Sequence, residues 1–200
     1  MPEISLTEFV DFVIKSGTPK LTEVKRIKRE HTKGYHPTRD YWCKLRDGIV
    51  EMHKQGLDKS SLDTLVRGIR DGNKAKNYPV MAAAYKRFLG RKTISWFNPM
   101  RGEWQHGALT VRVNPELGLK INGERYLVKL YFKDDPLTAQ RIAIISHMML
   151  DVLGPHAAGA KVALLDVRNS KLHSFDAVEP MIVPLLEGEA LSFCQMYGAV

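Results

Sequence analysis

Only two cysteines, Cys43 and Cys194, occur in the 200 residues of the chain, and neither belongs to a CxxC or Cys/His spacing. This scarcity argues against a disulfide framework and against a zinc module. We expect both thiols to be reduced and buried, as is usual in a cytosolic protein. The chain also lacks the basic-then-apolar order of a signal peptide, because Met1–Val10 is polar and acidic before it is apolar. Its expected location is the cytoplasm.

No apolar run approaches the ~20 residues that span a bilayer. The longest apolar-rich stretch, Ile142–Leu153, is interrupted by Ser146, His147 and Asp151. We therefore expect a soluble chain that has no membrane partner.

Familiar catalytic and cofactor-binding motifs are missing as well. The sequence contains no GxxxxGK(S/T) phosphate loop, no GxGxxG after an apolar strand and no GxSxG elbow. Its seven histidines show no metal-ligand spacing with cysteine or with acidic residues. We accordingly predict no bound cofactor and no resident metal.

Positive charge is abundant, and it is unevenly distributed. The chain has a net charge of +8; residues 1–92 hold 20 Lys and Arg against 11 Asp and Glu, whereas residues 93–200 hold 10 against 11. This asymmetry indicates that the first half faces any polyanion, through a phosphate attraction that salt weakens. A solvated, solubilising surface explains the same composition.

Residues 1–92 have the pattern of helices with short breaks. Ser5 and Glu8 have the spacing of a capping box, and Thr18-Pro19 predicts the start of a short, very basic helix. A polar loop, His31–Arg39, follows it, and then comes an amphipathic helix that begins near Trp42. We predict a basic helical region over residues 1–92, joined to a core over residues 93–200.

From Thr93 the pattern changes to the alternation of strands, which predicts an antiparallel meander. Asn122-Gly123 between apolar runs indicates a two-residue hairpin turn, which pairs Ile121 with Glu124. Counting outward along this register places Glu116 opposite Lys129. The same count places Asn114 opposite Tyr131 and Arg112 opposite Lys133.

The remaining segments complete the predicted fold class. Asp135-Pro136 is expected to cap a long buried helix that ends at Leu153. A central strand, Val162–Leu165, a return strand and a final helix from about Pro184 to Tyr197 follow. We therefore predict an α+β fold, in which helices pack on a mixed, largely antiparallel sheet.

This order of meander, long buried helix and further core strand resembles the common core of the restriction-endonuclease-like nucleases, named for their PD-(D/E)xK pattern. The resemblance covers residues 93–175. In that family an acidic residue on one hairpin strand, with an acidic residue and a lysine two places later on the next, binds a divalent metal and activates water. Pro115-Glu116 is similar to the first element, and Val128–Tyr131 occupies the place of the second.

The second element departs from the family pattern. Lys129 stands where the acid is expected, and Tyr131 stands where the lysine is expected. A metal site needs anionic oxygen ligands, and a cation opposite Glu116 neutralises the one carboxylate present. The resemblance thus implies a degenerate nuclease site, or a structural ion pair between Glu116 and Lys129.

Three functions fit these observations. The first is nucleic-acid association without catalysis, with Lys25, Arg26, Lys28, Arg29, Lys33 and Arg39 as contacts to the phosphates of DNA or RNA, and Tyr35 as the stacking aromatic. The second is a metal-dependent nuclease that uses Mg²⁺ with Glu116, Lys129 and Lys133, helped by Asp134, Asp135 or Asp166. The third is a module whose basic helices bind an acidic protein partner. The nuclease requires carboxylates that converge on Glu116, the binding protein a contiguous cationic face, and the module an exposed apolar patch.

Overall fold

The structure, a computed structural model, describes residues 1–34, 40–177 and 180–200. Within these ranges the chain forms seven helices and two mixed sheets, which confirms the predicted α+β class. The strands are β1 (Glu3–Ser5), β2 (Ile94–Phe97), β3 (Gly102–His106), β4 (Leu109–Val113), β5 (Leu117–Ile121), β6 (Glu124–Tyr131), β7 (Lys161–Asp166) and β8 (Lys171–Phe175). The helices are α1 (Leu6–Val13), α2 (Thr18–Thr32), α3 (Cys43–Lys54), α4 (Ser61–Arg67), α5 (Gly72–Leu89), α6 (Ala139–Leu153) and α7 (Val183–Ala199), with short 3-10 turns at Gly154–His156 and Pro180–Ile182.

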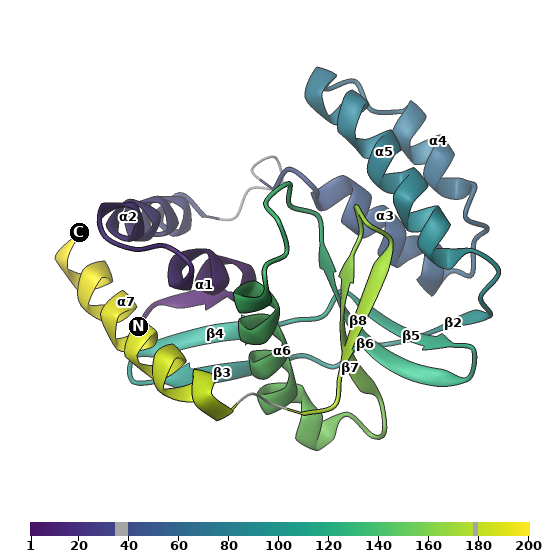
Figure 1. Cartoon of the computed structure of the whole chain (residues 1–200). Coiled ribbons are helices and arrows are strands. Elements are labelled where there is room, and N and C mark those ends of the chain that lie inside the picture. Colours follow the sequence, from purple (N-terminus) through teal and green to yellow (C-terminus); the bar gives the residue numbers. More distant parts are fainter. Residues whose placement is uncertain (35–39, 178–179) are drawn as a thin grey trace.

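The larger sheet has the strand order β2-β5-β6-β7-β8. All its neighbours are antiparallel except β6 and β7, which are parallel and are joined through α6. The smaller sheet has the order β1-β4-β3. Figure 1 shows α3, α4 and α5 together at one end of the molecule, α1, α2 and α7 at the other, and α6 between them.

The larger sheet separates two apolar cores, because successive side chains of a strand point to opposite faces. Val128, Leu130 and Leu165 pack with α3, α4 and α5 on one face. On the other face, Leu127 and Leu164 pack with α1, α6, α7 and the smaller sheet. The helices of residues 1–92 are therefore divided between the two cores, and each group packs on strands that follow residue 92. The boundary at residue 92 stays a prediction.

The turn at Asn122-Gly123 fixes the pairing of β5 and β6. Asn122 has a φ of 49° and Gly123 a φ of 97°, as a type I′ turn requires, and Ile121 is paired with Glu124. The predicted register is confirmed as far as Leu117, which pairs with Val128. The capping box is confirmed too, since Ser5 N donates to Glu8 Oε2 at 2.7 Å and Glu8 N donates to Ser5 Oγ at 3.3 Å.

Main-chain pairing with β6 stops at Leu117, although the side chains of Glu116 and Lys129 still meet, and the predicted position of Arg112 is wrong. The chain leaves the larger sheet before β5, so that Arg112 pairs with Ser5 and Glu103 in the smaller sheet and does not lie opposite Lys133. The single meander is wrong for the same reason, because β2 pairs with β5 while the intervening hairpin of β3 and β4 joins β1. Proline at position 115 has no N–H to donate, and it stands where the chain passes from one sheet to the other.

Two smaller predictions also need correction. Helix α6 begins at Ala139, with Thr138 as its N-cap, rather than directly after Asp135-Pro136. Cys43 and Cys194 are partly exposed rather than buried. In the described part of the chain no helix is both long and apolar enough to cross a bilayer.

Candidate functional site

Glu116 lies directly before β5 and contacts Lys129 on β6, as the hairpin register predicts. Lys129 Nζ donates a hydrogen bond to Glu116 Oε1, and both side chains are only 14% exposed. The second carboxylate oxygen, Oε2, accepts the N–H of Leu130 at 2.7 Å. Both oxygens of Glu116 therefore have donors within the protein.

These contacts close the end of the β5–β6 pair. Main-chain pairing stops at Leu117 and Val128, so the carboxylate of Glu116 supplies the acceptor for Leu130 that a longer β5 would have supplied. Lys129 Nζ also donates to the carbonyl of Asn114 at 3.2 Å, which holds the segment that leaves the sheet. The Glu116–Lys129 pair therefore has a structural role: it satisfies the main-chain donor of Leu130 and fixes the segment that precedes β5.

Arg46 on α3 extends this cluster of charges. It donates to Asp40 and lies 3.4 Å from Asp47. Burial opposes the charge of Arg46, but the hydrogen bond to Asp40 and the charges of Asp47 and Glu116 outweigh burial and raise its pKa. Glu116 is therefore near two cations, Lys129 in direct contact and Arg46 at longer range.

The other carboxylates considered for a nuclease site have partners of their own. Asp134 pairs with Arg168, and Asp135 lies 3.3 Å from Arg141. Asp166 is buried and accepts from the main chain and side chain of Asn169 at 3.1 and 2.7 Å. Among the described residues no three His, Cys, Asp or Glu side chains form a group that could hold a metal ion. The convergence on Glu116 that a metal-dependent nuclease needs is not found among these residues.

Lys133 pairs with a residue that the sequence did not suggest. Its ammonium donates to both carboxylate oxygens of Asp11 on α1, and the two side chains are 29% and 18% exposed. This ion pair joins the end of β6 to the N-terminal helix. A separation of 122 residues leaves no local signal for it, so only the folded chain reveals the partner.

A cavity of about 430 Å³ lies beside Lys133. Its lining consists of Tyr41, Trp42, Asn73, Asn77, Lys133, Asp134 and Asp135. Trp42 packs with its ring nearly parallel to those of Tyr78 and Phe132, each at 5.4 Å between centroids. Asn77 Nδ2 donates to the Tyr41 hydroxyl at 2.8 Å. The lining of the cavity therefore includes an aromatic residue fixed by ring stacking, together with side chains of both charges.

The predicted phosphate contacts on α2 divide into two groups. Lys25, Arg29 and Lys33 are exposed. Arg26 instead donates to Glu23 and Glu30, and Lys28 Nζ donates to the carbonyl of Tyr197 at 2.9 Å and to that of Val200. Tyr35 and Arg39 lie outside the described residues.

Glu23 organises the inner side of α2. Burial opposes its charge, but hydrogen bonds from Arg26 and Lys15 outweigh burial and lower its pKa. These two partly exposed cations are therefore neutralised by a buried carboxylate. The three exposed cations line a groove of about 370 Å³ together with Lys28, Thr32 and Val200. The positive charge of α2 that a partner can reach therefore comes from the exposed side of the helix, which carries Lys25, Arg29 and Lys33.

No protein-family model, curated protein or solved structure matches this chain. The resemblance to the restriction-endonuclease-like core remains a prediction based on the order of elements and on Pro115-Glu116. What the chain binds has to be inferred from its own side chains.

Proposed function

We propose that this protein binds nucleic acid through the outer side of α2 and does not catalyse its cleavage. Lys25, Arg29 and Lys33 follow one another at intervals of four residues, which places them on one side of the helix at steps of about 6 Å. The structure gives none of the three a carboxylate partner among the described residues. This row of uncompensated cations is the observation that supports the proposal, because such cations bind phosphates by releasing counterions.

The absence of catalysis is part of the proposal and is supported by the contacts of Glu116. Its two oxygens accept from Lys129 and Leu130, and a metal ion would have to displace both donors. Lys133, the displaced lysine of the nuclease hypothesis, is occupied by Asp11. A nuclease site built on these residues would therefore have to break two ion pairs before it could bind Mg²⁺.

Fluorescence anisotropy tests the proposal directly. The full chain is titrated against labelled duplex DNA, single-stranded DNA and RNA, with Mg²⁺ present and salt varied from about 50 to 300 mM. We expect binding that weakens steeply with salt and no cleavage of the probes. Lys25→Ala/Arg29→Ala/Lys33→Ala should make the slope of log K against log salt shallower by up to about 2.7, since each phosphate that a side chain neutralises adds about 0.9 to the slope.

A matched control removes three cations from strands and turns. Arg101→Ala/Arg112→Ala/Arg125→Ala, called here the strand control, lowers the net charge by the same amount and should leave most of the binding intact. Equal losses in the two variants would show a general charge effect rather than a site on α2. No binding of any probe at low salt would contradict nucleic-acid association altogether.

Association with a protein partner is the second candidate, and a specific observation favours it. Met181, in the 3-10 turn before α7, and Leu185 and Leu191 on α7 are 86%, 40% and 55% exposed, and exposed apolar side chains that join into one patch would mark a protein interface. If the anisotropy titration shows no nucleic-acid binding, this apolar surface becomes the leading candidate.

A further inference from the structure

A second and larger concentration of positive charge lies on α4 and α5 and on the segments next to them, outside the residues considered so far. Residues 54–92 hold ten Lys and Arg against three Asp, a net charge of +7 out of +8 for the whole chain. All these residues belong to the described part of the chain. Among the described residues, Lys86 is the member of this group that has a carboxylate within 4.0 Å, Asp63 at 2.6 Å. The other cations of the group have no carboxylate partner within the described ranges.

The outer side of α5 carries part of this charge. Lys76 and Arg87 are exposed and lie eleven residues apart, which is three helical turns and about 16 Å along the axis. Between them on the same side stand Val80 and Ala83, which are exposed and carry no charge. Arg91 follows just after the helix ends and is exposed too. The phosphate backbone of a nucleic acid can therefore approach these residues without meeting a carboxylate.

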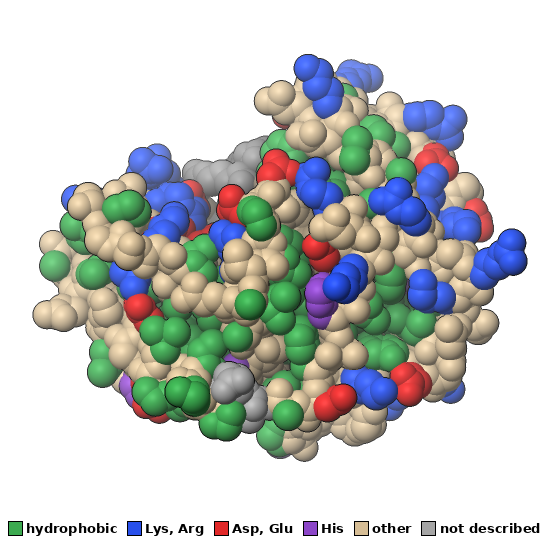
Figure 2. Space-filling model, viewed as in Figure 1, with side chains coloured by type: hydrophobic (Ala, Val, Ile, Leu, Met, Phe, Trp, Pro, Cys, Tyr) green, Lys and Arg blue, Asp and Glu red, His purple; other side chains and the backbone are tan. Residues whose placement is uncertain are grey.

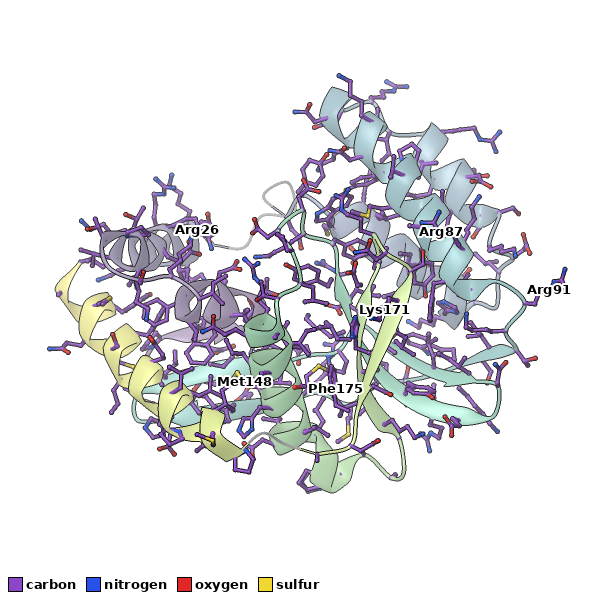
Figure 3. The ribbon with its side chains drawn as sticks, viewed as in Figure 1. Arg26, Arg87, Arg91, Met148, Lys171 and Phe175 are labelled. Atoms are coloured by element: carbon purple, nitrogen blue, oxygen red, sulfur yellow. The ribbon has the colours of Figure 1, made fainter. Side chains whose placement is uncertain are left out.

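The turn between β7 and β8 adds a further cation to this surface. Arg87 Nε donates to Ser170 Oγ at 3.1 Å, and Ser170 Oγ donates to the carbonyl of Ala84 at 2.7 Å. These bonds hold the turn against α5, and exposed Lys171 follows Ser170 directly; Figure 3 shows Lys171 on β8 below Arg87 of α5. Figure 2 shows Lys and Arg side chains gathered over α4 and α5 with few acidic ones among them. Lys76, Arg87, Arg91 and Lys171 are called here the α5 surface.

The types of side chain that are exposed indicate whether a single-stranded or a double-stranded nucleic acid would bind. Binding of a single strand relies on aromatic rings on which bases stack, whereas a duplex can be held through its phosphates alone. In the described ranges, the exposed large apolar residues are Met1, Leu57, Val80, Met181, Leu185 and Leu191, and no aromatic is among them. The α5 surface thus offers cations and aliphatic side chains, with no exposed aromatic ring among the described residues on which a base could stack.

We propose that the α5 surface binds the phosphate backbone of a double-stranded nucleic acid, independently of its sequence. The inference rests on the proposed nucleic-acid function and names its ligand class and a second contact surface. Helices α2 and α5 stand at opposite ends of the molecule (Figure 1), so the exposed cations of one can be removed without disturbing those of the other.

The test compares Lys76→Ala/Arg87→Ala/Arg91→Ala with the strand control in the same anisotropy titrations. Probes are a DNA duplex and an RNA duplex of about two helical turns, and a thymidine single strand of equal length. We expect the wild type to bind the duplexes more tightly than the single strand. In the α5 variant the salt slope should be shallower by up to about 2.7, which corresponds to an affinity that is tens to hundreds of fold weaker near 0.1 M salt.

The possible results separate this inference from the proposed function. Duplex binding that is weakened in the α5 variant and kept in the strand control supports the inference. If the α5 variant binds duplexes with the same salt slope as the wild type, the α5 surface is not a contact surface, while the proposed nucleic-acid association still stands. Tighter binding of the single strand overturns the duplex assignment. A wild type that binds none of the probes overturns the proposed function and this inference with it.

Discussion

Removing the charges of the Glu116–Lys129 pair, one at a time and together, should show that it is a structural ion pair. Lys129→Met leaves the carboxylate with the N–H of Leu130, 2.7 Å away. Glu116→Leu is more severe, because it leaves an ammonium only 14% exposed and a main-chain donor without its acceptor. We expect Glu116→Leu to lower the free energy of unfolding by about 3 kcal/mol and Lys129→Met by about 2 kcal/mol.

The double variant is the informative one. Glu116→Leu/Lys129→Met removes both charges, so the remaining cost is the unsatisfied N–H of Leu130 and imperfect packing, about 2 kcal/mol. The two single losses sum to about 5 kcal/mol, so the interaction energy is about 3 kcal/mol. Urea unfolding at pH 7, followed by the fluorescence of the three tryptophans, measures all four free energies.

An exposed cross-strand pair provides the control. Lys161 and Glu124 lie 3.2 Å apart with side chains 42% and 56% exposed, and the same cycle on them should give a much smaller interaction energy. Additive effects at Glu116 and Lys129 would refute the reasoning. A rise in stability when either charge is removed alone would also refute it, since residues strained for catalysis behave in that way.

Two further predictions concern stability. Burial lowers the pKa of His53 to about 4 from an ordinary value of 6.5, so between these pH values the unfolded chain binds more protons than the folded chain. The contribution of neutral His53 to the free energy of unfolding should be complete above pH 6.5. It should fall by about 2 to 3 kcal/mol as the pH drops to 4. Thermal unfolding against pH checks this, and the fall should be smaller in His53→Gln but unchanged in the exposed-site control His156→Gln; an equal fall in both would contradict it. In Gly118→Ala the new methyl group would lie 2.2 Å from the carbonyl oxygen of Phe97 across the β2–β5 pair, so urea unfolding should show a free energy of unfolding that is lower by about 3 kcal/mol. The control Gly188→Ala places its methyl group where no atom lies within 4 Å, so it should be neutral or slightly stabilising. An unchanged midpoint for Gly118→Ala would show that β2 shifts without cost.

Features that depend on neighbours in the sequence were predicted well. The turn at Asn122-Gly123 needs two residues that tolerate positive φ, and the capping box needs Ser5 and Glu8 three positions apart. From that turn, counting residues was enough to bring Glu116 and Lys129 together. The prediction failed where the chain left the sheet, because register extends only while both strands remain paired. Nothing in the alternation of β4 shows that its partners are β1 and β3.

The sequence by itself determined the α+β class, the β5–β6 hairpin, the Glu116–Lys129 contact and the excess of cations in the first half of the chain. These follow from turn chemistry, from the two-residue period of strands and from composition, which are local or additive properties. The tertiary structure decided which cations remain available, because carboxylates remote in sequence neutralise some of them: Asp11 reaches Lys133, and Glu189 on α7 reaches Lys20 on α2. Such pairings arise only when packing of the two apolar cores brings distant segments together.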